Sequence, residues 1–575
     1  MGSIVFAILL ILVVLGPVIQ FIRKRRYKAA LLRYFRLSWG QRKTPPAASE
    51  IDRIGLYDRL KSRDSANSLD EKTWNDLNLD LVFEYIDRST SRVGQQFLFH
   101  LLKNPHPKEE PLLKFERLIQ AFSNANLRES LQSELYHLSH KDALYLPYLF
   151  LEELPRLRTH RFVLLALSIA TLVSVAGAFS STSFRVIAVL LVTVNMFISL
   201  YYRRQLEAFI QPLRLLNVLI NTSQRIAEKF TGSEISEQTE KLKDEVKNVS
   251  ELKQKTAVLA FDRPSDDLSS AIYSYLNMAL LLDVNCFAFA VEDLRNKSKN
   301  VAALYETLGY LDAAISVASL RHGNPSLTTP IFIAPGKACR FTQLYHPLLE
   351  SPVANDLTIN GKGILLTGSN MSGKSTFIRT VGVNAVLAQS IHCCFAQEYR
   401  APFLDVKACM GATDSFAEGK SYYFSEVENV LALVNATQSG RQYLFLLDEL
   451  FRGTNTIERV AAAKAILEYI NRGDNIVMIA THDIELAELL DQQYESHHFR
   501  EIIHDEQMSF DFKLQRGTSS TRNAIAILGM FGYPQSIVAG ALKAVDQLAR
   551  KKSPKSGLFD RLLDSIRIDM DHTKG

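Results

Sequence analysis

The sequence predicts three parts: an α/β domain near the C-terminus, an all-α region before it, and three transmembrane helices. From about residue 325 onward, short apolar runs bounded by turn residues alternate with helical patterns, which is typical of a mostly parallel sheet covered by helices. Upstream, apolar residues recur at helical spacing, and three long runs are almost free of charge. A chain of 575 residues is long enough for several domains. The predicted strands are 363–367, 443–447 and 475–480.

Composition sets few limits on function. The chain is 47% hydrophobic and 22% charged, and its net charge of +5 does not by itself predict nucleic-acid binding. Five cysteines, an odd number without a C-x-x-C pair, predict reduced thiols rather than a disulfide framework. His392, Cys393 and Cys394 make a poor metal site because adjacent residues converge badly on one ion.

Residues 4–22 have the length and composition of a membrane-spanning helix. They lack a basic segment in front and an A-x-A-like cleavage site behind, which favours a retained anchor over a signal peptide. Four basic residues, 23–26, follow directly. The positive-inside rule therefore predicts that the N-terminus lies outside and the bulk of the chain in the cytoplasm.

Two further apolar runs, 162–179 and 184–202, are separated only by residues 180–183. Arginines precede and follow the pair, whereas the turn region carries only Arg185. These features predict a transmembrane helical hairpin with both ends in the cytoplasm, in the same orientation as the first helix. Two buried core helices are the alternative. We therefore expect a multi-pass protein of the inner or plasma membrane, in contact with membrane lipid.

The remaining segments follow from these assignments. Helical spacing marks the all-α region, which the hairpin interrupts. The predicted order is an anchor (1–28), a juxtamembrane connector (29–73), the first helical part (74–155), the hairpin (156–205), the second helical part (206–324), the α/β domain (325–550) and a basic tail (551–575).

The stretch GSNMSGKST, which follows the first predicted strand, fits the phosphate-binding pattern G-x-x-x-x-G-K-[ST]. Its glycines let backbone N–H groups face phosphate, Lys374 supplies a cation, and Ser375 supplies a hydroxyl ligand for Mg²⁺. The following helix points its positive end at the anion. The predicted nucleotide-binding residues are Gly368, Ser369, Asn370, Met371, Ser372, Gly373, Lys374, Ser375 and Thr376.

Polar residues end the other two predicted strands. The run YLFLLDEL leads into Asp448, a predicted Mg²⁺ ligand, and Glu449, predicted to orient or deprotonate water. The run NIVMIATHD places His482 where it can sense the γ-phosphate. Because ligands bind at the carboxyl edge of such sheets, these groups predict a domain that binds and hydrolyses ATP with Mg²⁺, and its catalytic residues are Glu449, His482 and Lys374.

These motifs resemble those of the MutS mismatch-repair ATPases. TGSNMSGKST is similar to the family's TGPNMGGKST, DELFRGTNT to DEIGRGTST with Phe451 in place of a glycine, and ATH at 480–482 is shared. The stretch GATDSFAEGKSYYFSEV resembles a family segment that offers a serine, here Ser421, to the nucleotide of the partner subunit. The resemblance covers roughly residues 74–155 and 206–550.

The resemblance implies an ABC-type P-loop ATPase domain, an all-α core or lever domain, and a homodimer closed by ATP. Lys374, Ser375, Asp448 and Glu449 would act in their own subunit and Ser421 across the interface. Residues 517–541 resemble the C-terminal dimerisation helices.

The chain also departs from the family. Only about 45 residues separate the first membrane helix from the helical core, too few for the mismatch-reading domain, and the hairpin stands where the family inserts a DNA-gripping clamp. Two functions stay open: a membrane-anchored MutS-like ATPase that acts on DNA in mismatch repair or on other DNA structures, and an ATP-driven machine that moves its own hairpin or a protein partner. Direct solute transport is a weaker third, and no DNA-binding residue can be named from the sequence.

Overall fold

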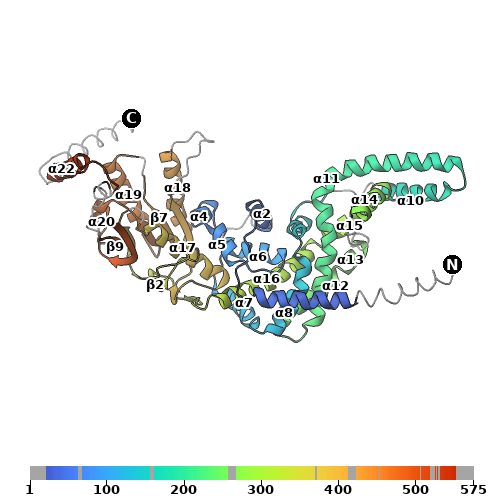
Figure 1. Cartoon of the computed structure of the whole chain (residues 1–575), viewed down its shortest axis with the longest axis horizontal. Helices are drawn as coiled ribbons and strands as arrows, with labels where there is room; N and C mark the ends of the chain where they lie inside the picture. The colour runs from blue at the N-terminus through green and yellow to red at the C-terminus, as the bar shows by residue number, and fades with distance from the viewer. Residues whose placement is uncertain are drawn as a thin grey trace.

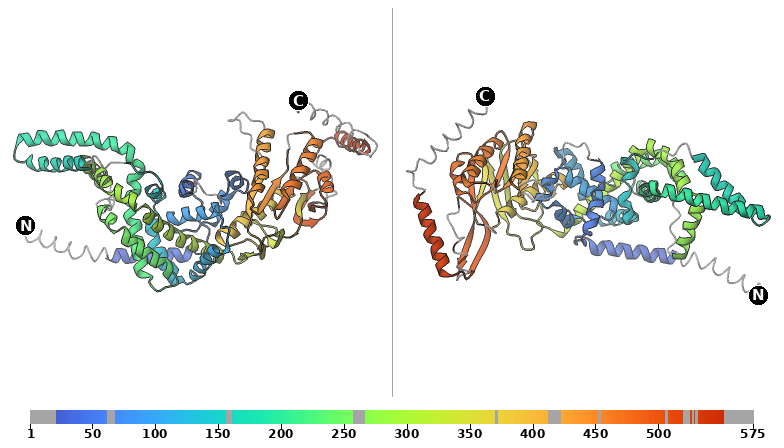
Figure 2. Two further views of the ribbon diagram at one scale, coloured as in Figure 1. Left: turned by 180° about the vertical axis from the view of Figure 1, so that it is seen from behind. Right: turned by 90° about the horizontal axis from the view of Figure 1, so that it is seen from above.

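The computed structural model describes residues 21–61, 68–155, 161–256, 267–369, 372–411, 422–451, 454–504, 507–518, 525, 528 and 531–551. Over these residues the molecule is elongated (Figure 1). The β-sheets and their covering helices lie at one end, and the hairpin of α10 (Arg161–Gly177) and α11 (Thr182–Lys229) projects at the other. The helical region connects the two ends, as the views in Figure 2 also show.

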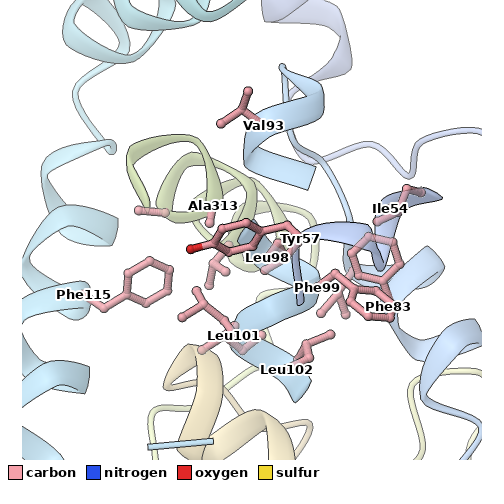
Figure 3. Packing of buried hydrophobic residues seen from close by; sticks show 14 of the residues in the cluster. Ile54, Tyr57, Phe83, Val93, Leu98, Phe99, Leu101, Leu102, Phe115 and Ala313 are labelled. Carbon is pink, nitrogen blue, oxygen red and sulfur yellow. The ribbon is translucent and has the colours of Figure 1, made fainter. Parts of the chain in front are cut away.

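The helical region is built around α16 (Ser298–Gly323), which packs against α6 (Arg92–Lys103), α7 (Glu109–Ala121) and α12 (Ser236–Asn248). Figure 3 shows how Tyr57, Leu98, Phe115 and Ala313 meet in its interior, each from a different helix. The other elements are a helix over 21–38, α2 (Ala48–Ile54), α3 (Leu56–Lys61), α4 (Glu71–Asp76), α5 (Leu79–Ile86), α8 (Ala125–Leu135), η1 (Tyr136–Leu138), η2 (Lys141–Tyr145), α9 (Tyr148–Leu151), α13 (Ser250–Thr256), α14 (Asp267–Leu280) and α15 (Leu282–Asn296).

Part of the predicted connector, residues 29–73, is folded into this region. Ile54 and Tyr57 are fully buried in the shared core. Arg36, near the end of the helix over 21–38, forms an ion pair with Glu129 on α8, with an N–O distance of 2.9 Å. A polar-looking sequence therefore contributes core residues, although Tyr34 and Leu37 of the same segment stay exposed.

α16 is long and apolar enough to cross a membrane, yet 78% of its apolar window is buried inside the protein. Its fully buried Asp312 accepts hydrogen bonds from the backbone N–H groups of Thr90 and Ser91 and from the Ser91 hydroxyl. These bonds satisfy the carboxylate away from water. We therefore interpret α16 as the central helix of the helical core.

A six-stranded sheet forms the centre of the described α/β part, with strand order β10-β9-β4-β8-β7-β6. β9, β4, β8, β7 and β6 run parallel, and β10 pairs antiparallel to β9. A second sheet has the order β1-β5-β2-β3. The bounds are β1 (Ile331–Phe332), β2 (Ala338–Leu344), β3 (Asn355–Asn360), β4 (Gly363–Thr367), β5 (Glu398–Ala401), β6 (Asp405–Met410), β7 (Tyr443–Asp448), β8 (Ile476–Ala480), β9 (Tyr494–His504) and β10 (Gln507–Arg516).

Alternate residues of the central strands pack on opposite faces of the sheet, as the period of a strand requires. Ile364 and Leu366 join the large core that includes α17 (Lys374–Ile391), whereas Leu365 joins a separate cluster. That second cluster contains residues of α18 (Tyr422–Ala436), α19 (Thr456–Ile470) and α20 (Ile484–Leu489). Helices on both faces explain why the central strands are apolar throughout. η5 (Thr437–Ser439) follows α18, and α22 (Gln535–Lys551) ends the described chain.

α17 also contacts α6 and α7, and these contacts link the loop in front of α17 to the helical region. The Arg379 guanidinium on α17 donates to the carbonyl of Asp76, and the Asp76 carboxylate accepts from the N–H of Met410 at the end of β6. At the far end of α17, His392 contacts Glu116 of α7.

α11 runs without interruption for 48 residues and contains Pro212. It therefore crosses the predicted boundary at residue 205, and one helix belongs to both the hairpin and the helical region. Within it, Thr182–Leu206 has the length and hydropathy of a membrane span and is only 17% buried. α10 is apolar but has only 17 residues. The first predicted span, 4–22, lies almost entirely outside the described residues.

Candidate nucleotide site

The phosphate loop follows β4 and ends in α17, as predicted. Gly368 has φ +137°, and a Cβ at this position would lie 2.8 Å from the carbonyl oxygen of Phe499. Gly373, which precedes α17, has φ +107°. Both backbone conformations favour glycine. The buried Lys374 amine donates to the carbonyls of Gly368 and Ser369, each at 2.7 Å, and is thereby held inside the loop.

The three predicted polar groups converge next to this loop. Asp448 ends β7, and the N–H of Glu449 donates to the carbonyl of Ala480 at the end of β8. His482 Nε2 lies 2.9 Å from Glu449 Oε1 and 3.5 Å from the Lys374 amine. Because β4, β7 and β8 are parallel, their carboxyl ends meet at one edge of the sheet, and this edge brings all four groups together.

Backbone strain marks the turn after β7. Glu449 has φ +52° and Phe451 has φ +61°. The left-handed region is costly for residues with a side chain, and it is tolerated where the surroundings hold the backbone. Phe451 stands where the resembled family has glycine, and here burial of its ring against Tyr423 accompanies the strained backbone.

A cavity of about 420 Å³ opens beside the loop. Its polar lining residues include Ser369, Ser375 and Glu449, and aromatic and aliphatic side chains form a wall that lines much of the rest. Burial, with the nearby Arg379, lowers the pKa of His346 in this wall to about 4, so its imidazole is neutral at neutral pH. The wall consists of Leu344, Tyr345, His346, Leu349, Val353, Phe377, Phe499 and Phe512.

The residues present fit a nucleotide phosphate and Mg²⁺. At Gly368 the loop is too tight for a side chain, and Ser372 Oγ is buried without a hydrogen-bond partner in the described part of the chain. A bound phosphate would accept from such donors. Ser375 and Asp448 supply the hydroxyl and carboxylate oxygens that Mg²⁺ prefers.

Sequence reasoning missed the far wall of the cavity. Phe499 and Phe512 come from β9 and β10, whose mixed polar and apolar residues give no clear strand signal. Thr376, one of the predicted nucleotide-binding residues, lines the cavity. Asn370, Met371 and Ser421 lie outside the described residues.

Comparison with known proteins agrees with this geometry. Residues 364–549 match the family model described as MutS domain V. The chain is 31% identical over 280 residues to the DNA mismatch repair protein MutS of Thermus thermophilus, a match that covers 47% of this chain and 33% of that protein. It is 33% identical over 288 residues to MutS of Pseudothermotoga lettingae (48% and 34%) and 28% identical over 269 residues to MSH3 of Phaeosphaeria nodorum (44% and 24%).

The matched part spans about a third of the length of the bacterial relatives. The phosphate loop, the two carboxylates and the strand-end histidine all lie inside the region matched by the family model. Through this C-terminal part, the chain belongs to the MutS family.

Proposed function

We propose that this protein is a membrane-anchored MutS-type ATPase that binds and hydrolyses Mg·ATP as a homodimer. The observation that carries the proposal is that Glu449 and Lys374 lie 2.9 Å and 3.5 Å from His482, beside a loop whose backbone favours glycine at positions 368 and 373.

The side chains take separate roles in this reaction. Lys374 and the N–H groups of the loop bind the phosphates, and Ser375 with Asp448 holds Mg²⁺, which would neutralise charge on the phosphate oxygens. Glu449 accepts a proton from, or orients, the attacking water. His482 holds the Glu449 carboxylate in place through the 2.9 Å contact.

Two features support the dimer. The family resemblance predicts that Ser421 reaches the nucleotide of the partner subunit, and α22 presents exposed apolar residues such as Ile537 and Leu542. A second copy is the occupant that the resemblance assigns to this helix.

The membrane part of the proposal is supported by the inverted packing of the hairpin. Large apolar side chains face outward, for example Phe197, which is 65% exposed, whereas Asn195 is fully buried and Thr171 and Ser174 are nearly so. Water favours the opposite arrangement, and lipid favours this one because its hydrocarbon solvates apolar surface and leaves polar groups to pair inside. The hairpin lies at the far end from the nucleotide site (Figure 1).

DNA is the second candidate ligand. The relatives that match about half of this chain are named as DNA mismatch repair proteins, which favours a DNA-related role for the shared part. The alternative is that ATP moves the hairpin or a protein partner through α11, which is continuous from the hairpin into the helical region.

Two substitutions test the ATPase. Glu449→Gln in the full chain should lower turnover about 10²- to 10⁴-fold and retain bound ATP, since the general base is lost while the phosphate contacts stay. Lys374→Ala should lose nucleotide binding. The matched controls are the exposed Glu488→Gln and Lys362→Ala, which should leave both measurements unchanged. Normal turnover in either site variant would disprove the assignment.

One titration separates the two functions. The ATP-bound protein is titrated with mismatched, branched and perfect duplexes at several salt concentrations, because phosphate contacts make DNA binding strongly salt-dependent. Binding at low salt supports the DNA role, and its complete absence rejects it. ATP turnover that is the same in detergent and in vesicles, and the same with or without the hairpin, would reject the membrane-coupled alternative.

A further inference from the structure

The break between α14 and α15 is held by side chains from the hairpin. Only Leu281 separates the two helices; it has φ +51°, and the axes differ in direction by 62°. Such a break removes the helical N–H partners of the preceding carbonyls. Asn195 Nδ2 donates to the carbonyl of Ala279 at 2.7 Å, and Ser168 Oγ donates to the carbonyl of Leu280 at 2.8 Å. Both donors come from the hairpin, one from each helix.

A second set of contacts fixes the bent form. Asn277 Nδ2 donates to the Asp283 carboxylate at 2.7 Å, while Asn277 Oδ1 accepts from the N–H of Asp283 at 2.9 Å. Arg214 on α11 donates to the same carboxylate at 2.6 Å. Asn277 and Asp283 therefore bridge the break. Two residues of α11, Asn195 and Arg214, bind to opposite sides of it.

The break meets the hairpin at half its length. Ser168 is seven residues beyond Arg161, at the middle of the 17-residue α10, and Asn195 is thirteen residues beyond Thr182, at the middle of the 25-residue span. With the hairpin in a bilayer, these carbonyls lie at membrane depth. Irregular backbone is tolerated there only where protein satisfies its polar groups, and Asn195 and Ser168 do so.

α14 also extends the apolar outer surface of the hairpin. It packs against both α10 and α11 (Figure 1). Tyr275 is 72% exposed and Leu276 is 51% exposed. Acyl chains are the occupant that fits, because this surface adjoins a span only 17% buried and of high mean hydropathy.

We propose that α14 and the α14–α15 break form a re-entrant element that enters the bilayer together with the hairpin. This inference rests on the proposed membrane function. From the break, α15 leads back to α13 and α16, so the element joins the lever helices to the middle of the hairpin.

Single fluorescent labels test the proposal in the full chain reconstituted in phosphatidylcholine vesicles. The described native cysteines are all buried, so an introduced cysteine is the accessible target. Labels are placed at Tyr275→Cys on α14, at Phe197→Cys on the hairpin and at the exposed Lys243→Cys on α12 as the aqueous control. Quenching by spin-labelled lipid is compared with quenching by iodide.

The expected result is lipid quenching at 275 and 197 and iodide quenching at 243. Lipid quenching at 197 with iodide quenching at 275 would overturn the re-entrant element and leave the membrane hairpin intact. Iodide quenching at both positions would overturn the membrane proposal itself. Because Tyr275 and Phe197 are exposed, their substitution leaves the core unchanged.

A second variant tests the role of Asn195. Asn195→Leu removes the donor to Ala279 and should lower lipid quenching at position 275 at least about twofold, because an unpaired carbonyl is costly in hydrocarbon. Thr193→Leu, an exposed change on the same helix, should leave it unchanged. Equal quenching in both variants would overturn the assignment of Asn195.

Discussion

Replacing Glu116 with glutamine should destabilise the contact between the helical region and the α/β part. The Glu116 carboxylate accepts from Arg321 Nη1 at 2.8 Å and from Nη2 at 2.7 Å, and His392 Nδ1 lies 3.0 Å away. Burial raises the pKa of this carboxyl, but the hydrogen bonds from His392 and Arg321 outweigh burial and lower it from 4.5 to about 2.

The size of the effect follows from this shift. A difference of about 2.5 pKa units corresponds to at most about 3.4 kcal/mol. Glutamine retains one acceptor oxygen, so we expect a loss of about 2 kcal/mol and a decrease in Tm of about 4 °C. Because the folded-state pKa is depressed, the stabilisation is fully present above pH 4.5 and is lost as the pH falls toward 2.

The decrease in Tm is measured by thermal unfolding of the full chain in detergent micelles, followed by circular dichroism. Glu110→Gln on the same helix is the control, since its pairing with Lys114 is exposed to solvent. An unchanged Tm of Glu116→Gln at pH 7, or a difference from wild type that stays constant down to about pH 3, would refute the reasoning.

Three further substitutions probe the site and its supports. Gly368→Ala should abolish ATP binding, measured by equilibrium titration, because its Cβ would lie 2.8 Å from the Phe499 carbonyl oxygen. Asp76→Asn should lower ATP turnover more than it changes nucleotide affinity, because the anionic acceptor of the Met410 N–H is lost. A fall in affinity large enough to explain the whole fall in turnover would contradict this. Asp312→Asn should lower the Tm by an amount equivalent to about 1–3 kcal/mol, since its carboxylate accepts three hydrogen bonds in the core; an unchanged Tm would show that these bonds contribute little.

The placing of the candidate site residues at one edge of the sheet was the part of the structure best predicted from the sequence. Lys374, Asp448, Glu449 and His482 each follow an apolar run, and parallel strands bring their carboxyl ends to one edge without any further information. The predicted strands 363–367, 443–447 and 475–480 correspond to β4, β7 and β8, with bounds shifted by at most one residue.

Other features depend on contacts that no local pattern records. β9 and the edge strand β10 mix polar and apolar residues without a clear alternation, and so the aromatic wall of the cavity was missed. The α14–α15 break lies in the apolar stretch 278–282, which no glycine or proline marks, and it depends on Asn195, which is distant in the sequence. The apolar composition of α16 suits lipid as well as a protein core, and only its packing partners distinguish the two.

The unbroken α11 has a mechanical consequence. α11 contains Pro212 and is not a straight rod, because it turns sharply between the hairpin and the helical region (Figure 1). At 1.5 Å per residue its span Thr182–Leu206 is about 37 Å long. A proline inside a helix removes one backbone hydrogen bond, so bending costs least at that point. A tilt of only about 5° at the base of this span would move the Thr182 end sideways by about 3 Å, close to the distance between successive Cα atoms, so a slight rotation at the base becomes a displacement of nearly one residue at the tip.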